Sequence, residues 1–572
     1  MKNRETRSCY TAAGAALTGQ PWANAYPRPQ LQRDSFINLN GWWDFSVSDG
    51  DALPEEYPER ILVPYPPQSL LSGIHRDIPE GRYLIYRTAF PRPEAGGRLL
   101  LHIGAADQCA AVFLNGKPVG EHTGGYEAFS LDITDAVTEE NELVIRVIDH
   151  MSRGVLPYGK QRAKRGGMWY TPVSGIWQTV WLEAVPEQYI RRLHIRTEET
   201  CVRITADGAE NGTVTIETPD GPLTAALMGG QAEVHLTAPR LWSPEDPYLY
   251  HFTLTAGEDT VRSYFALRTL TVRTVDGYPR LCLNGKPYFF HGLLDQGYWS
   301  DGLFTPAAPE CYAQDILAAK ALGFNTLRKH IKVEPEQFYY DCDRLGIVVF
   351  QDMVNNGGYS FLRDTALPTI GMKRLEDRRL HRDGETRRAF LTAMEQTVRQ
   401  LENHPCICCW TIFNEGWGQF DSGAAYRRLK ALDDSRFINT VSGWFVSPGT
   451  ESDVVSEHVY FRPFRPHKTD KPLVLSEFGG YALTLPGHAF NPTNEYGYRR
   501  FTDPAEYQRA LVTLYETEIV PAVAQGLCAS IYTQLSDVED ETNGLVTYDR
   551  AVCKVSPEAM LPLARKLTIN ES

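Results

Sequence analysis

Residues 409–420 read CWTIFNEGWGQF, an apolar run that ends abruptly at Asn414-Glu415-Gly416. A strand that is apolar on both faces is buried on both faces, as the strands of a parallel sheet are. Through the C-terminal half of the chain, eight such strands alternate with helical segments. Because parallel strands need crossover helices, and eight such units close on themselves, we predict a catalytic (β/α)8 TIM barrel over residues 275–572.

The N-terminal half has a different pattern, in which short alternating strands are separated by turn residues. Segments such as YLIYRTAF, RLLLHIGA and NELVIRVID follow this pattern, and a smaller set that ends with SYFALRTLTV continues it. Asn115-Gly116 between two apolar runs predicts a hairpin, since both central residues of such a turn need positive φ. We predict a jelly-roll β-sandwich over residues 1–187 and an immunoglobulin-like β-sandwich over residues 188–274.

The composition is that of a globular protein that does not bind nucleic acid. The 572 residues are 42% hydrophobic and 22% charged with a net charge of −14, whereas binding to phosphates needs a basic surface. No apolar run is long enough to span a membrane, and the segment TAAGAAL near the N-terminus is too weakly apolar for a signal peptide. We therefore expect a cytoplasmic protein.

Two of the predicted barrel strands end in glutamate. The fourth strand ends at Glu415 in TIFNEG, and the seventh ends at Glu477 in LVLSEFGG. Chemistry in such barrels takes place at the C-terminal ends of the strands, so both carboxylates are expected at one mouth. Two facing carboxylates are the machinery of glycoside hydrolysis. One such glutamate alone could cap a loop or pair with an arginine, but two at matching strand ends favour catalysis.

The chain resembles the family 2 glycoside hydrolases, which include β-galactosidases, β-glucuronidases and β-mannosidases. The resemblance covers nearly the whole chain and includes the segments PRPQLQRDSFINLNGWWDF, VSGIWQTVWLE and LWSPEDPYLY. FNEGWGQF is similar to the acid/base segment of this family, and SEFGG is similar to its nucleophile segment. The resemblance implies a retaining enzyme in which Glu415 is the general acid/base and Glu477 is the nucleophile. Their carboxyl groups should then lie about 5–5.5 Å apart, with Glu415 protonated and Glu477 negative.

The same resemblance implies roles for three more residues. Asn414 matches the asparagine that binds the sugar 2-hydroxyl, Arg328 the arginine in the barrel floor that keeps the nucleophile ionised, and Tyr460 the tyrosine that hydrogen-bonds the nucleophile. For Asn414 and Tyr460 the alternatives are a turn-forming asparagine and an ordinary packing tyrosine.

Four further candidates follow from residue type and position along the chain rather than from the family resemblance. His330 shares the inward face of its strand with Arg328, although a structural histidine is an equal alternative. Trp417 and Trp444 could offer an aromatic face to a sugar, or they could plug the barrel mouth. Asp295 follows the first barrel strand and could bind sugar hydroxyls, or it could cap a loop.

Two segments of the sequence differ from the family pattern in ways that affect which sugar is expected. Many members carry tryptophan on strand 8, whereas this strand reads SIYTQLSD, so that Tyr532 or Gln534 would have to substitute. Glucuronidases hold the sugar carboxylate with an Asn-x-Lys element near strand 8, and the corresponding region, ETNGLVTYDRAVCK, lacks it. Basic loops at residues 361–390 and 461–471 favour an acidic sugar, but the negative charge of the SDVEDE loop offsets most of their positive charge.

We therefore predict an exo-acting, β-galactosidase-like hydrolase of a neutral β-hexoside. The alternatives are a β-glucuronidase-like enzyme and a catalytically inactive carbohydrate-binding protein.

The 11 cysteines, with Cys406, Cys408 and Cys409 in one buried strand, are expected to be reduced packing thiols. No metal-ligand motif occurs, so no cofactor is predicted, although some family members depend on Mg²⁺ or Na⁺. The predicted partner is a glycoside or oligosaccharide, and family members often form homo-oligomers through their sandwich domains.

Overall fold

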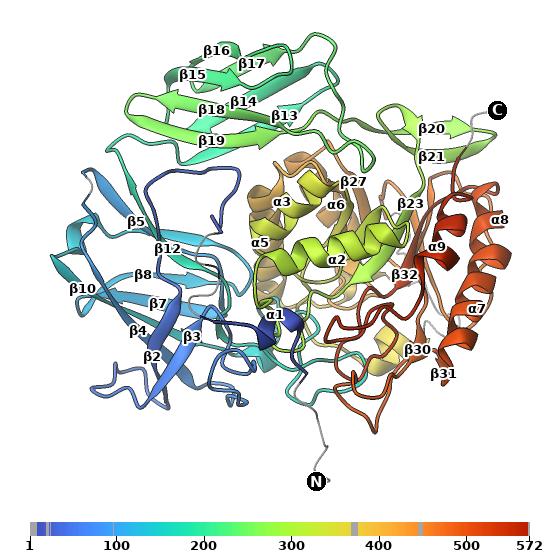
Figure 1. The fold of residues 1–572 in the computed structure, drawn as a ribbon, viewed down its shortest axis with the longest axis horizontal. Coiled ribbons are helices and arrows are strands. Elements are labelled where there is room, and N and C mark those ends of the chain that lie inside the picture. The colour runs from blue at the N-terminus through green and yellow to red at the C-terminus, as the bar shows by residue number, and fades with distance from the viewer. Residues whose placement is uncertain are drawn as a thin grey trace.

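The structure, a computed structural model, describes residues 9–18, 22, 25–94, 96–367, 376–443 and 450–569. Figure 1 shows a first β-sandwich at the left, a second above it and an α/β barrel at the right. A short helix, α1 (Ala12–Ala15), precedes the first sandwich. None of the described helices combines the length and the apolar character needed to cross a lipid bilayer.

The first sandwich consists of a four-stranded and a six-stranded sheet. The four-stranded order is β1 (Phe36–Asn38), β12 (Val180–Val185), β5 (Arg98–Ile103) and β9 (Phe129–Asp132). The six-stranded order is β3 (Glu59–Val63), β2 (Gly41–Ser48), β4 (Tyr83–Pro91), β10 (Glu140–Ile148), β7 (Cys109–Leu114) and β8 (Lys117–Thr123). A minor pair joins β6 (Ala106–Asp107) to β11 (Gly175–Ile176). The predicted hairpin is confirmed, because Asn115 and Gly116 link β7 to β8 with φ of 53° and 76°.

The second sandwich is a seven-stranded sheet folded on itself. Its order is β13 (Arg192–Thr197), β14 (Cys201–Asp207), β17 (Gln231–His235), β16 (Leu223–Met228), β15 (Asn211–Ile216), β18 (Tyr250–Ala256) and β19 (Asp259–Phe265). A single residue pair, Met228 with Gln231, joins β16 to β17. The two halves therefore enclose one apolar core between them.

The segment SYFALRTLTV is two strands rather than one. Its first part is in β19, and its second part, β20 (Leu270–Val275), pairs with β21 (Tyr278–Leu283) in a separate small sheet with β22 (Lys286–Pro287). Arg268 lies at the break and donates to the carbonyls of Pro405 (2.6 Å) and Ile407 (2.7 Å). Its buried guanidinium thus anchors the end of the sandwich to the barrel.

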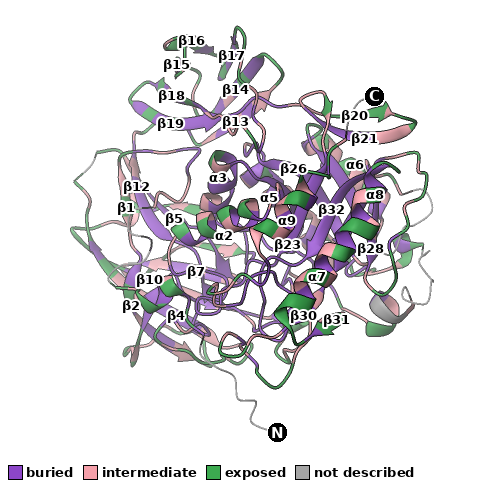
Figure 2. Cartoon of the chain, turned by 45° about the vertical axis from the view of Figure 1, so that its right-hand side comes forward, coloured by how far each residue is buried: buried purple, intermediate pink, exposed green. Residues whose placement is uncertain are grey.

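The eight predicted barrel strands are confirmed, and all pair in parallel. Their order is β27 (Phe437–Ser442), β26 (Ile407–Asn414), β25 (Val348–Asp352), β24 (Thr326–Lys329), β23 (Phe290–Asp295), β32 (Leu527–Thr533), β29 (Leu473–Gly479) and β28 (Val455–Val459). Every residue of β26 is buried, as its apolar sequence predicts, and the same holds for β23 and β32, which are purple in Figure 2. Ser456 of β28 links the two end strands through hydrogen bonds to Asn439 (3.2 Å) and Ser442 (3.4 Å) of β27.

Helices cover the outside of the barrel. They are α2 (Glu310–Ala321), α3 (Glu336–Leu345), α5 (Gly384–Leu401), α6 (Ser422–Leu432), α7 (Pro504–Leu514), α8 (Val520–Val523) and α9 (Pro557–Ala564). Side chains of Asp383 and Asp503 cap α5 and α7 by accepting from the amides of Thr386 and Glu506. The described connection from β28 to β29, residues 460–472, holds no helix, because three prolines interrupt it.

Short elements complete the described chain. They are the 3₁₀ turns Thr134–Ala136, Met151–Arg153 and Asp377–Arg379, the π turns Leu362–Ala366 and Tyr515–Ile519, and the parallel pair β30 (Tyr481–Leu483) and β31 (Arg499–Phe501). All 11 cysteines are free, which confirms the expected reduced thiols.

Arg33 joins the two sandwiches through a buried ion-pair network. Its guanidinium contacts Asp259 of β19 at 2.7 Å and Glu183 of β12 at 3.3 Å, and all three side chains are at most 4% exposed. Because Asp259 accepts two of these hydrogen bonds, the guanidinium and carboxylate meet as a two-pronged pair.

We expect Asp259→Ala to lower the free energy of unfolding by about 3–5 kcal/mol, because it leaves the Arg33 charge buried without its main partner. Urea unfolding followed by circular dichroism measures this change. Asp34→Asn is the matched control, since Asp34 pairs with Arg262 at the surface and should matter little. If both variants lost the same free energy of unfolding, the buried ion pair would not be more stabilising than the exposed one, and the prediction would be wrong.

Candidate functional site

The two glutamates at the strand ends lie in one site at the mouth of the barrel. Glu477 is a residue of β29, and Glu415 directly follows β26. The chain turns out of β26 because Glu415 and Gly416 have φ of 51° and 73°, so the Glu415 side chain is presented at the mouth. One carboxylate oxygen of each glutamate lies within 4.8 Å of the other, with His458 between them.

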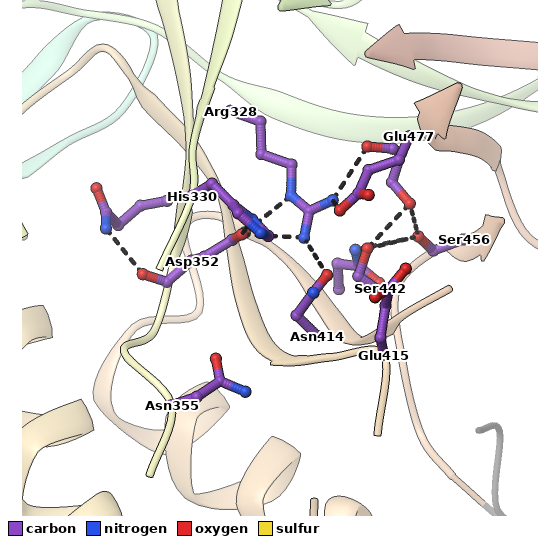
Figure 3. Close-up of polar contacts among 12 residues, drawn as sticks. Arg328, His330, Asp352, Asn355, Asn414, Glu415, Ser442, Ser456 and Glu477 are labelled. Atoms are coloured by element: carbon purple, nitrogen blue, oxygen red, sulfur yellow. Dashed lines mark hydrogen bonds and ion pairs between the residues drawn. The ribbon is translucent and has the colours of Figure 1, made fainter. Parts of the chain in front are cut away.

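Arg328 is the centre of the charged network, as Figure 3 shows. Its guanidinium donates to Glu477 Oε1 at 3.0 Å, to Asp352 Oδ1 at 3.0 Å and to Asn414 Oδ1 at 2.9 Å. The Arg328 side chain is 1% exposed, and a buried charge is stable only when it is paired in this way. Arg328 therefore holds three strand ends of the mouth in a fixed arrangement.

Glu477 is held in its charged form. Burial alone would raise the pKa of its carboxyl, but the positive charges of His458 and Arg328 outweigh burial and lower this pKa to about 2. Tyr460 donates a hydrogen bond of 2.5 Å to Glu477 Oε2, while its ring stacks on Tyr498 at 3.7 Å. Burial and the neighbouring Glu477 raise the pKa of Tyr460 well above its usual value, so the phenol remains a donor.

The remaining predicted residues divide into two groups. His330 is buried beside the network and bonds Asp352 Oδ2 at 2.7 Å through Nδ1. Asp295 lies apart from the glutamates, in an ion pair of 2.5 Å with Lys329. Trp417 is 3% exposed and packs edge-on against Trp169, which leaves almost none of its ring for a ligand. Trp444 lies outside the described residues.

The residues on strand 8 do not occupy the place of a sugar-facing tryptophan. Tyr532 is fully buried, and Gly479 has no room for a Cβ because Tyr532 would lie 2.3 Å from it. Gln534 is engaged with Gln296 and Asn543 at 2.9 and 2.8 Å. Thr533 is the strand-8 residue that reaches the site, through a hydrogen bond of 2.9 Å between its hydroxyl and that of Tyr460.

A loop of the first sandwich crosses to the barrel mouth. Tyr158 donates its amide to Asn355 O at 3.0 Å and its hydroxyl to Gly357 O at 2.7 Å, and Gly159 packs against the backbone of Ile331. Further along this loop, the Tyr170 hydroxyl bonds the carboxyl of Glu541. The first sandwich therefore supplies part of the wall of the site.

Lys160 is carried by this loop into the site. Its side chain is half-buried, and in the part of the chain that the structure describes its ammonium makes no hydrogen bond or ion pair. Burial raises the pKa values of Glu477 and Glu541, and the Lys160 charge opposes this effect at both carboxyls. Lys160 is thus an unneutralised positive charge beside the nucleophile candidate.

Among the described residues, two groups bring potential metal ligands together. One is Glu415, His458 and Glu477, which is the site itself, and Arg328 already neutralises Glu477 there. The other is Cys201, Glu233 and His235 on the second sandwich, where Arg203 pairs with Glu233 at 2.7 Å. Neither group adds to the case for a cofactor, and metal dependence remains an open prediction.

The sequence analysis missed His458, Lys160 and Asp352. His458 could have been found, because it precedes Tyr460 by two residues and a strand places such residues on one face. Asp352 ends a barrel strand, as Glu415 does. Lys160 has no local signal, because its position depends on how the first sandwich packs against the barrel.

Comparisons with known proteins agree with this architecture. The family model "Glycosyl hydrolases family 2, TIM barrel domain" matches residues 275–554, and the model "Glycosyl hydrolases family 2" matches residues 189–268. The β-glucuronidase of Felis catus is 25% identical, with 88% of this chain and 85% of the relative covered. A β-galactosidase of Thermoanaerobacter pseudethanolicus is 26% identical, with 67% and 52% covered.

Two solved structures share the fold over almost the whole chain. The β-D-glucuronidase of Dictyoglomus thermophilum superposes with a TM-score of 0.74 at 20% identity, covering 96% of this chain and 99% of that one. A β-galacturonidase from Eisenbergiella tayi gives a TM-score of 0.68 at 19% identity, with the same coverage.

The low pKa of Glu477 predicts a measurable acid sensitivity. Its pKa in the folded chain, about 2, lies below its ordinary value of 4.5, so its stabilising contribution is complete above pH 4.5 and is lost as the pH falls toward 2. Relative to Glu477→Gln, the wild-type free energy of unfolding should therefore fall by about 3 kcal/mol over this range. Urea unfolding at several pH values measures it. Glu516→Gln, at an exposed site, is the control, and parallel curves for wild type and Glu477→Gln would contradict the prediction.

Proposed function

Because the chain belongs to family 2 of the glycoside hydrolases, we propose that it is a retaining, exo-acting β-glycosidase with Glu477 as nucleophile and Glu415 as general acid/base. The observation that carries this proposal is the meeting of the two carboxylates, whose nearest oxygens lie within 4.8 Å. Retaining enzymes place their carboxyl groups about 5–5.5 Å apart, whereas inverting enzymes need about 6.5–9.5 Å to admit a water.

The reaction proceeds in two displacements. Glu477 attacks the anomeric carbon while Glu415 gives its proton to the aglycone oxygen, which leaves as the alcohol. The covalent ester removes the charge of Glu477, so Glu415 becomes more acidic and can accept a proton from water. That water attacks the anomeric carbon, and Glu477 leaves as a carboxylate with the sugar configuration retained.

The neighbours of Glu477 suit these steps. Arg328 keeps the nucleophile ionised before attack, and it also fixes the amide of Asn414 through Oδ1. This orientation supports the family role of Asn414 in binding the sugar 2-hydroxyl. Arg328 and the Tyr460 hydroxyl each donate to one oxygen of Glu477, and together they fix the orientation of its carboxylate.

We expect Glu477→Gln to reduce turnover by at least about 10⁴-fold on every substrate, because no ester can form. Glu415→Gln should lose about 10²- to 10⁴-fold on alkyl glycosides but little on dinitrophenyl glycosides, whose leaving group needs no proton. Steady-state kinetics with both substrates measure the difference. Glu457→Gln, a barrel-strand glutamate that lies 3.7 Å from His467, is the control. Equal losses for Glu415→Gln on both substrates would contradict its assignment.

For the sugar, we propose a β-uronide rather than the neutral β-galactoside that the sequence alone favours. The comparisons do not favour β-galactosidases, since similar proteins include β-glucuronidases and a β-galacturonidase as well as a β-galactosidase. Lys160 supports an acidic sugar, because an unpaired ammonium beside the site can bind a carboxylate on C6. It would act from the first sandwich, in place of the Asn-x-Lys element that strand 8 lacks.

We expect Lys160→Gln to reduce kcat/KM on a nitrophenyl β-uronide by about 10- to 100-fold, the range for a lost charge-assisted hydrogen bond. Activity on the matching neutral hexoside should change little. Lys164→Gln, an exposed lysine of the same loop, is the control. A panel of β-glucuronide, β-galacturonide, β-galactoside and β-glucoside measures the preference. A wild-type preference for galactoside would favour the neutral alternative, and sugar binding without hydrolysis would favour an inactive binding protein.

Other predictions remain proposals. They are the domain boundaries at residues 187 and 274, the cytoplasmic location, the absence of a required cofactor and assembly into a homo-oligomer.

A further inference from the structure

His458 lies between the two glutamates and is not used by the mechanism above. Its Nδ1 is 2.8 Å from Glu415 Oε1 and 3.5 Å from Glu477 Oε2, and its side chain is fully buried. The Glu415 side chain, in contrast, is 21% exposed at the mouth. In the described chain, the contact with His458 is the one hydrogen bond that the Glu415 carboxyl makes. The imidazole is therefore what fixes the direction of this carboxyl.

The ring of His458 is itself held rigidly. Its Nε2 lies 2.8 Å from the hydroxyl of Ser442, which donates its own proton to Ser476 at 2.9 Å. This pair of serines holds the Nε2 edge of the ring in place. On the other side, a Cβ on Gly443 would lie 2.7 Å from Nδ1, so glycine is required beside the ring.

The ring in this orientation keeps Nδ1 directed at the carboxyl of Glu415, 2.8 Å from Oε1. The groups that face the ring are Glu415 from β26, Ser442 from β27, Glu477 from β29 and Arg328 from β24, whose Nη1 is 3.5 Å from Nε2.

We infer that His458 is a positioning residue for acid catalysis, which holds the carboxyl of Glu415 toward the aglycone oxygen. In the first displacement the O–H bond of Glu415 breaks, its proton passes to the aglycone oxygen, and the electron pair of the glycosidic bond leaves with the aglycone. The imidazole neither gains nor loses a proton in this step. This inference rests on the proposed role of Glu415.

The test compares leaving groups in His458→Asn. We expect kcat/KM on an alkyl glycoside to fall by about 10- to 100-fold, a part of the contribution of a positioned acid. On the dinitrophenyl glycoside, whose departure needs no proton, the loss should stay below about threefold. Ser442→Ala, which removes the anchor of the ring, should show a smaller loss with the same selectivity. His467→Asn, at an exposed histidine of the following loop, should behave as wild type.

The split between leaving groups is itself the readout that a merely structural role would not move, because loss of folded enzyme lowers both activities equally.

The outcomes separate this inference from the proposed function. If Glu415→Gln discriminates between leaving groups but His458→Asn loses both activities equally, or neither, the role of His458 is overturned and that of Glu415 stands. If Glu415→Gln itself fails to discriminate, the proposed function is overturned. If His458→Asn does not fold, Ser442→Ala decides, and unchanged or unselective kinetics in that variant overturn the inference.

Discussion

The buried guanidinium of Arg328 is the interaction on which the site depends. It is enclosed at 1% exposure, so its charge requires partners that three other strands of the barrel provide together. Asp352 ends β25, Asn414 ends β26 and Glu477 belongs to β29. A shift of any of these strands by one residue would turn its polar side chain away and leave the charge unpaired. The requirement to neutralise one cation therefore fixes the strand register and the charge of the nucleophile together.

The two glutamates differ because their surroundings differ. Glu477 is buried and surrounded by cations and a phenol, which hold it ionised. Glu415 stands at the end of its strand in a left-handed turn, with the imidazole of His458 as its hydrogen-bond partner. Two side chains of the same type, separated by 62 positions in the sequence, thus obtain opposite roles from their neighbours.

Much of this architecture could be predicted from the sequence, because it depends on local patterns. The uniformly apolar strands gave the barrel, the alternating strands gave the sandwiches, and Asn115-Gly116 gave a hairpin. The glutamates were found because the strand ends of a barrel converge, and Arg328 was found because its segment resembles that of the family. The break at Arg268, the burial of Trp417 and the position of Lys160 were not found, since each depends on contacts between distant segments. Asp295 could be placed at a strand end, but its pairing with Lys329 could not be foreseen.

The loop that carries Tyr158 and Lys160 has a consequence for how such an enzyme can diversify. The barrel holds the two glutamates in a network that tolerates little change, whereas the loop reaches the site from the first sandwich and lies outside the barrel sheet. Its side chains can be exchanged without disturbing the register of any barrel strand. If the proposed roles hold, bond cleavage and sugar choice are encoded in separate stretches of the chain, so that the loop can change in evolution while the barrel network stays constant.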